Sequence, residues 1–188
     1  MTTPSGFVIG FEDILLREAQ ALATDAIAAT VSRDVAAKSF VSILVSVAAF
    51  EALVGTWTAI YRHDYKIADQ TLAQWRDRPI TGVVKDILTR LTPPTTASSC
   101  SWYPGLAAIV LLRNHLAHYF PDSRPVGTWP TQLVGLFTSG LLTSGGTDQM
   151  DWTSRVLVGP VAQQVVDHAE RAFKGFSDVA WHLPDAAA

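Results

Sequence analysis

The sequence predicts an all-α protein: a helical bundle of four to five main helices with one long irregular loop. Apolar residues recur at the three- and four-residue spacing of helices in several long stretches, and little of the chain has the alternation typical of strands. Segments rich in proline, glycine, serine and threonine separate these stretches. Because a domain usually has about 100–200 residues, we expect residues 1–188 to form a single domain with its core at about 10–175.

Two long helices are expected at the start of the chain, at residues 11–31 and 35–61. The first is amphipathic, and a short break at 32–34 offers Ser32 or Asp34 as a cap for the second. The second helix is apolar nearly all round, which is typical of a helix at the centre of a bundle or shared with a partner chain. Its apolar residues include Phe40, Val41, Ile43, Leu44, Val45, Val47, Phe50, Leu53, Val54 and Trp57.

The middle of the chain is more polar. Residues 65–91 predict one or two shorter helices separated at Pro79, and 92–99 has the composition of a loop. A further helix is expected from about Tyr103 to Phe120, because Pro121 cannot continue it.

The last third begins with the long irregular loop, residues 121–152. It is rich in proline, glycine, serine and threonine, could hold a short helix or strand at 131–137, and has a glycine pair at Gly145–Gly146 that suggests a flexible tip. The final helix is expected at 156–173, and the tail 177–188 is expected to fray.

Composition restricts the protein class. The net charge of −3 gives no general attraction to nucleic acid, so any RNA contact has to be local. The single cysteine, Cys100, fits a reducing cytoplasm, and residues 1–10 lack the pattern of a signal peptide. The apolar stretch between Lys38 and Glu51 has only 12 residues without a charge, where a membrane span needs about 20. We therefore expect a cytoplasmic protein without a membrane segment.

The most distinctive segment is Arg113-Asn114-His115-Leu116-Ala117-His118, within the expected helix 103–120. Helical spacing places Arg113, Asn114 and His118 within roughly 140° on one side of the helix. Asn114 and His118 are four residues apart and can touch. A cation, an amide and an imidazole in an otherwise apolar helix indicate a functional site.

This segment resembles the signature of the HEPN domain family (higher eukaryotes and prokaryotes nucleotide-binding). That signature is an arginine, often followed by Asn, Asp or His, with a histidine four to six residues after the arginine. The apolar helix carrying Glu51 is similar to the family's earlier helix, and the pattern at 152–162 is similar to that of some prokaryotic members. The resemblance covers most of residues 10–175.

The resemblance implies a small helical bundle and, for a prokaryotic HEPN ribonuclease-like protein, metal-independent endoribonuclease activity. Such proteins occur in toxin–antitoxin, abortive-infection and CRISPR-associated defence systems, and they generally form homodimers in which two motifs line one cleft. We therefore expect an RNA substrate and an antitoxin or defence-system partner. One toxin subgroup has a tyrosine two residues after the histidine; here that residue is Phe120, with Tyr119 one position earlier. The regulation of that subgroup is therefore not expected.

The motif residues suit RNA cleavage without a metal. Histidine transfers protons near neutral pH, so His118 is expected to be the general base or acid. Arg113 offers a planar fork of donors to the phosphate, and Asn114 would orient His118 or bind the phosphate. Glu51, His115 and Tyr119 are expected to support this set.

Each of these residues also has a structural interpretation. His118 can stabilise the carbonyl end of its helix, Arg113 can pair with Glu51 across two packed helices, and Asn114 can bond between helices. His115 is either a surface or interface residue or, with the helix rotated, the working histidine.

Two further functions stay open beside the ribonuclease. One is a non-catalytic HEPN module that binds a nucleotide, RNA or a partner protein, and the other is a structural bundle whose motif closes its own core. The sequence has no glycine-rich phosphate loop, nucleophile elbow or Cys/His metal spacing, so no cofactor and no metal are expected.

Overall fold

The computed structural model describes residues 10–64, 67–91, 93–118, 128–145 and 150–181. Within these ranges the chain is helical and contains no strand, which confirms the all-α class. The helices are α1 (Phe11–Ala28), α2 (Ser32–Asp64), α3 (Asp69–Arg76), α4 (Ile80–Arg90), α5 (Tyr103–Ala117), α6 (Thr131–Thr138), α7 (Trp152–Val156) and α8 (Gly159–Ala180), with a 3-10 helix, η1, at Ala97–Ser99.

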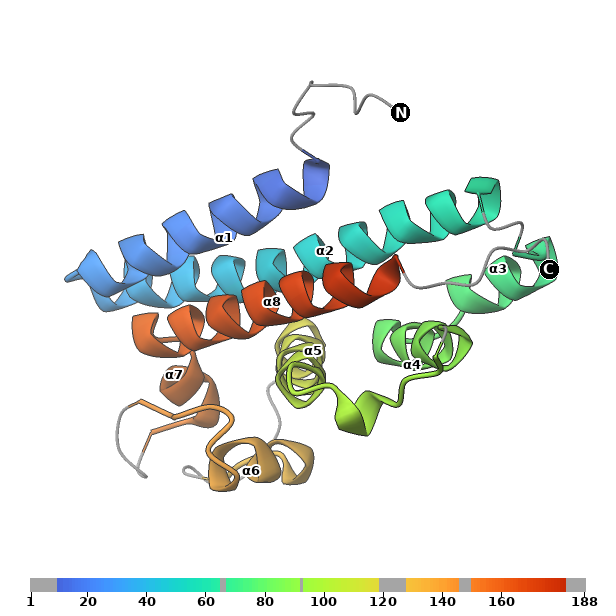
Figure 1. Cartoon of the computed structure of the whole chain (residues 1–188). Helices are drawn as coiled ribbons and strands as arrows, with labels where there is room; N and C mark the ends of the chain where they lie inside the picture. The colour runs from blue at the N-terminus through green and yellow to red at the C-terminus, as the bar shows by residue number, and fades with distance from the viewer. Residues whose placement is uncertain (1–9, 65–66, 92, 119–127, 146–149, 182–188) are drawn as a thin grey trace.

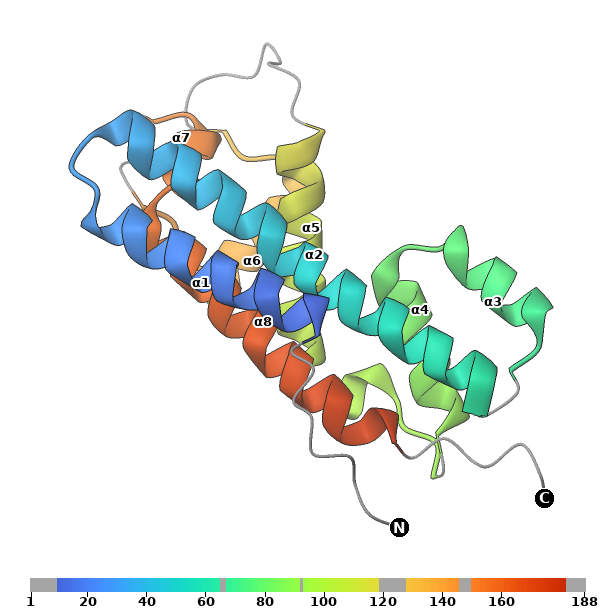
Figure 2. The ribbon, with the colours of Figure 1, turned by 90° about the horizontal axis from the view of Figure 1, so that it is seen from above.

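The helices form two layers (Figure 1). The long helices α1, α2 and α8 lie side by side in one layer, and α5 crosses beneath α2 and α8 at a steep angle. Helices α4, α6 and α7 complete the second layer, while α3 and α4 lie beside the C-terminal half of α2, away from α1 (Figure 2). The apolar helix α2 is therefore central, as its sequence predicts.

Small residues bring α1 and α2 close together. Ala19, Ala23 and Ala26 of α1 are buried, and the facing side of α2 carries three fully buried serines, at 39, 42 and 46. The Ser42 hydroxyl donates to the Ala19 carbonyl at 2.8 Å, and Ser46 donates to the carbonyl of Ser42. These bonds satisfy the hydroxyl groups of Ser42 and Ser46, which would be costly to bury unpaired, whereas the buried Ser39 hydroxyl has no partner among the described residues.

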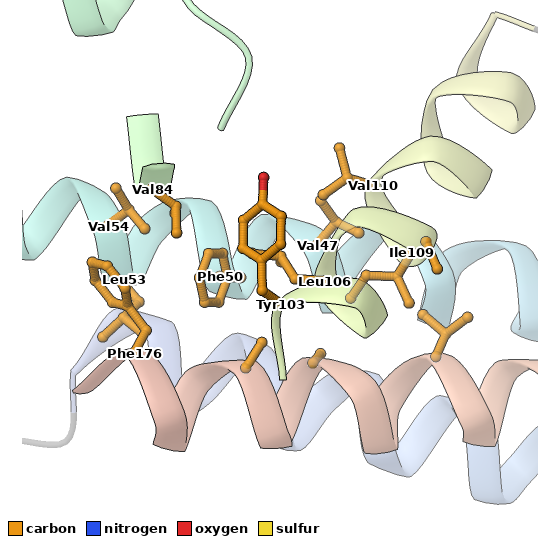
Figure 3. Packing of buried hydrophobic residues seen from close by; sticks show 14 of the residues in the cluster. Val47, Phe50, Leu53, Val54, Val84, Tyr103, Leu106, Ile109, Val110 and Phe176 are labelled. Carbon is orange, nitrogen blue, oxygen red and sulfur yellow. The ribbon is translucent and has the colours of Figure 1, made fainter. Parts of the chain in front are cut away.

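The main core lies between the layers, where α2, α5 and α8 meet (Figure 3). Phe50 of α2 packs edge-to-face on Phe176 of α8, with ring centroids 5.7 Å apart. Leu106 and Ile109 of α5 are fully buried in the same cluster. This packing fixes which side of α5 faces α2, and so the direction in which the motif residues point.

Several helix boundaries differ from the prediction. The break between α1 and α2 lies at 29–31 rather than at 32–34, so Ser32 and Asp34 belong to the first turn of α2. The amide of Asp34 instead bonds the Val31 carbonyl, at 2.9 Å. Asp34 in the first turn is favourable because the helix dipole is positive there.

Within the predicted long irregular loop, residues 131–138 form α6, so of the two alternatives for 131–137 it is the helix that forms. Leu133 and Leu136 are buried, so this helix is held by the core and not by its own propensity. Gly145 is described and its amide bonds the Arg155 carbonyl at 2.8 Å. The remainder of the predicted tip, Gly146, lies outside the described residues.

The prediction that the tail frays from residue 177 is also wrong for its first part. Helix α8 continues to Ala180, and residues 182–188 lie outside the described part of the chain. Phe176 and Ala180 are fully buried, and the Tyr61 hydroxyl of α2 donates to the Ala180 carbonyl at 3.1 Å. Burial and this bond hold the last turn in place.

Helix α2 has the length and apolar composition that would allow residues Ser32–Arg62 to cross a membrane. Half of its most apolar window is buried inside the protein. Core helices of bundles pass the same test, so the observation is weak as an indication of a membrane segment.

Candidate functional site

The motif arginine pairs with a glutamate from another helix. Arg113, near the end of α5, donates from Nη2 to the Oε1 atom of Glu51 on α2, 62 residues away in sequence. The arginine side chain is 24% exposed and the glutamate 41% exposed, so solvent reaches the glutamate more easily. This contact confirms the predicted alternative that Arg113 and Glu51 pair across two packed helices.

The inner part of the Arg113 side chain is more enclosed than its tip. Its Nε is buried and has no hydrogen-bond partner among the described residues. Glu51 therefore supplies the carboxylate that compensates a half-buried cation, since a buried charge is costly unless it is paired. For Arg113 to clamp a phosphate, the phosphate has to share or replace the Glu51 carboxylate.

The motif histidine has a different environment. His118 follows the last residue of α5 as its C-cap, and its backbone N–H bonds the Asn114 carbonyl at 3.1 Å. It is exposed to solvent. Five residues of helix turn its direction by about 140° from that of Arg113. The structure therefore does not bring His118 and Arg113 together against one buried surface.

The remaining predicted site residues lie around this helix end. Asn114 and His115 are both partly buried in the last turn of α5. Helical spacing leaves Asn114 only about 40° from His118, so the amide and the imidazole share a side of the helix. Tyr119, the third supporting residue, lies outside the described residues.

Glu51 also lines a cavity that the sequence did not predict. This cavity of about 700 Å³ lies between the C-terminal half of α2, α3 and the start of α4. Three arginines line it as well: Arg62, Arg76 and Arg78. These arginines flank the two ends of α3, but nothing in their spacing distinguishes them from an ordinary solvated surface.

One histidine outside the predicted site is partly buried and bonded. His168 of α8 approaches the Leu141 carbonyl through Nε2 at 2.7 Å, and Arg171 lies 3.0 Å from its Nδ1. These contacts fit a neutral ring that donates from Nε2 and accepts at Nδ1. A glycine at 105 gives the ring room, because a Cβ there would overlap it. His168 is a packing residue between α5 and α8.

Burial shifts two titratable groups near the start of α5. It raises the pKa of the Cys100 thiol, against a smaller opposing effect of the Ser99 hydroxyl. Burial also raises the pKa of Tyr103, whose hydroxyl donates to the Thr81 carbonyl of α4 at 3.1 Å. Both groups are therefore neutral near pH 7, and neither lies at the motif end of the helix.

No three His, Cys, Asp or Glu residues of the described part of the chain come close enough to hold a metal ion. A comparison of the chain with protein-family models, curated proteins and solved structures found no match. The function therefore has to be argued from the site itself.

Proposed function

We propose that this protein is a metal-independent endoribonuclease of the HEPN type that acts as a homodimer. The observation that carries the proposal is the exposed imidazole of His118 at the open end of α5, beside Asn114. An exposed imidazole can reach a large substrate such as RNA and exchange protons with it near neutral pH. Arg113, held by Glu51 one turn earlier, would supply positive charge for the phosphate.

The reaction requires two proton transfers. One His118 removes the proton from a 2′-hydroxyl, whose oxygen then attacks the neighbouring phosphorus. The bond from phosphorus to the 5′-oxygen breaks, and that oxygen takes a proton from a second imidazole. The products are a 2′,3′-cyclic phosphate and a 5′-hydroxyl. Because one chain presents a single His118, the second imidazole would come from the partner copy.

The biological setting we propose rests on the resemblance of the motif to that of HEPN ribonucleases. A ribonuclease of this type would act in the cytoplasm as a toxin or as a component of a defence system, under the control of an antitoxin or another partner protein. The low content of lysine and arginine, 14 residues against 17 acidic ones, means that RNA contacts would be confined to the cleft between the two copies.

The second candidate function is a non-catalytic HEPN module that binds a nucleotide, RNA or a protein. The Arg113–Glu51 pair favours it, because a carboxylate already neutralises the motif arginine within one chain. In this alternative the pair connects α2 to α5, and His118 only stabilises the carbonyl end of α5.

Cleavage of a single-stranded RNA in EDTA tests the proposal. Wild type should cleave, and His118→Ala should be slower by about 10²–10⁴-fold, the usual contribution of a proton-transfer group. His115→Ala is measured beside it and tests the alternative that the neighbouring imidazole is the working histidine. The products should carry a 2′,3′-cyclic phosphate.

Three results separate the candidates. Loss of cleavage only in His118→Ala supports the ribonuclease, and loss only in His115→Ala moves the catalytic role to that residue. Absence of cleavage by wild type on several RNAs contradicts the enzyme and favours the binding module. Circular dichroism of each variant has to show unchanged helicity, so that a loss of activity is not a loss of folding.

A further inference from the structure

The cavity beside α2 has the size and lining of a ligand site. Its volume of about 700 Å³ lies within the range of roughly 300–1,000 Å³ that is typical of small-molecule sites. It lies on the side of α2 away from α1, where α3 and α4 stand beside the helix (Figure 2). The residues that line the cavity come from these three helices and from the turn between α3 and α4.

Its lining is mixed. Apolar residues form part of it, namely Val54, Leu72, Trp75, Ile80 and Val83, and the carboxylates of Glu51 and Asp69 also line it. Trp75 is 5% exposed, and its indole N–H is already engaged, since it donates to the Asp86 carboxylate at 2.6 Å. What Trp75 can offer a ligand is therefore the apolar part of its ring, which suits a flat or hydrophobic group.

Cationic side chains line the same cavity. Arg62 pairs with Asp69 at 3.1 Å, but both side chains are largely exposed, at 61% and 78%. Arg78 approaches Asp86 only at 4.0 Å and is 47% exposed. Arg76 is exposed and has no ion-pair partner among the described residues. Exposed pairs of this kind are weak, so the guanidinium groups are free to reorient toward an anion.

The chemistry of the lining restricts the ligand class. Guanidinium groups present planar forks of donors that match the oxygens of phosphate, and three of them line this partly apolar cavity. An anion alone would leave the apolar surface uncovered, and an apolar molecule alone would leave the arginines unused. A molecule with both parts matches both surfaces.

We propose that the cavity between α2, α3 and α4 binds a small organic phosphate, with the phosphate at Arg62, Arg76 and Arg78 and the organic part against Val54, Trp75 and Val83. His118 does not line this cavity. The proposal therefore stands independently of the ribonuclease. Glu51 alone belongs to both places, because it lines the cavity and pairs with Arg113.

The backbone offers a way to block the cavity without changing its charges. Gly55 of α2 lines it, is exposed, and has open space where a Cβ would stand. Gly55→Phe should place a ring in the cavity while leaving the packed core unchanged. Gly135→Phe is the matched control, since Gly135 is also an exposed helical glycine with open space around it, and it is not one of the cavity residues.

Titration calorimetry of the full chain with AMP and with phenyl phosphate tests the proposal. Both should bind with one site per chain, and adenosine and inorganic phosphate should each bind at least about tenfold more weakly than AMP. Gly55→Phe should abolish AMP binding and Gly135→Phe should keep it. Arg76→Gln should weaken it by about tenfold, the effect of losing one charge-assisted hydrogen bond, whereas Arg17→Gln on α1 should not.

Salt dependence gives a second readout, because exposed arginines are screened by ions. AMP affinity should fall as sodium chloride rises, and the fall should be smaller in Arg76→Gln. Absence of binding of both phosphates at about 5 mM would overturn the proposal, as would equal binding by wild type and Gly55→Phe. His118→Ala should bind AMP like the wild type, so the outcome is separate from that of the RNA cleavage assay.

Discussion

The two sides of α2 are packed in opposite ways. On the side of α1 and α8, the backbones of these two helices lie so close at one position that a glycine is required there. A Cβ on Gly159, at the start of α8, would lie 2.8 Å from the backbone nitrogen of Ile27 in α1. On the side of α3 and α4, a Cβ on Gly55 would meet nothing within 4 Å, and a cavity of about 700 Å³ remains.

The close packing on the side of α1 and α8 fixes how the long helices are arranged. The side of α3 and α4 leaves space beside α2 for a ligand. Protein interiors are packed to the density of organic crystals, as the close side is, whereas the cavity on the open side reaches solvent at exposed residues such as Gly55. Glu51 lies at the boundary, since it lines the open side and binds Arg113. Arg113 is therefore linked to the cavity through its ion pair with Glu51.

The largest effect on stability is expected from Gly159→Ala, which tests the close side. Because the new Cβ meets backbone atoms that cannot rotate away, α1 or α8 has to shift, at a cost of about 2–3 kcal/mol. Urea denaturation measures it. Gly135→Ala, in open space, is the control. An unchanged denaturation midpoint in Gly159→Ala would show that α1 and α8 are not packed this tightly.

Glu51→Gln tests the ion pair at the boundary between the two sides of α2. This change leaves the half-buried Arg113 without its carboxylate and should cost about 1–2 kcal/mol, between the values for exposed and buried pairs. Asp69→Asn, in the exposed pair with Arg62, should change stability by less than about 0.5 kcal/mol. A double-mutant cycle with Arg113→Met measures the coupling directly. A coupling near zero would mean that the pair does not connect α2 to α5.

Tyr103→Phe tests how α4 is attached to α5. Loss of the hydroxyl bond to the Thr81 carbonyl should cost about 1 kcal/mol at pH 7. Burial raises the pKa of Tyr103 above its ordinary value. The stability that the Tyr103 hydroxyl contributes is thus fully present below about pH 10 and is lost as the pH rises through the pKa of the folded state. The difference between wild type and variant should therefore shrink above pH 10, and a constant difference up to pH 11 would contradict this.

The smallest effect is expected from Gly55→Ala, on the open side. The methyl group has space, and alanine is the better helix former, so the variant should be more stable by about 0.5–1 kcal/mol. Thermal denaturation measures the gain. A loss of stability would mean that the space beside Gly55 is occupied in solution.

Much of the fold could be predicted from the sequence, and the errors have physical causes. The helix in 131–138 was left undecided and the end of α8 was placed too early, because in both places burial decides the outcome. Leu133 and Leu136 hold α6, and the Tyr61 hydroxyl with its buried partner Ala180 holds the last turn of α8. Neither contact is local in sequence.

Less of the candidate site could be predicted. The pairing of Arg113 with Glu51 was one of two alternatives, and the environment of His118 was not decided by its spacing. His168 was missed, since its partners are a carbonyl 27 residues away and an arginine whose contact depends on the ring orientation. The arginines around the cavity have no sequence signal, because only the fold brings the two ends of α3 against α2.

The sequence by itself determined the helices, the central place of α2 and the grouping of Arg113, Asn114 and His118 within two turns of one helix. These are local properties, set by residue spacing and by proline and glycine. Only the tertiary structure decided that Arg113 faces Glu51 while His118 faces solvent, and that a cavity lies beside α2. The crossing of α5 over α2 and the incomplete packing of α3 and α4 decide these features, and both depend on contacts between residues far apart in the chain.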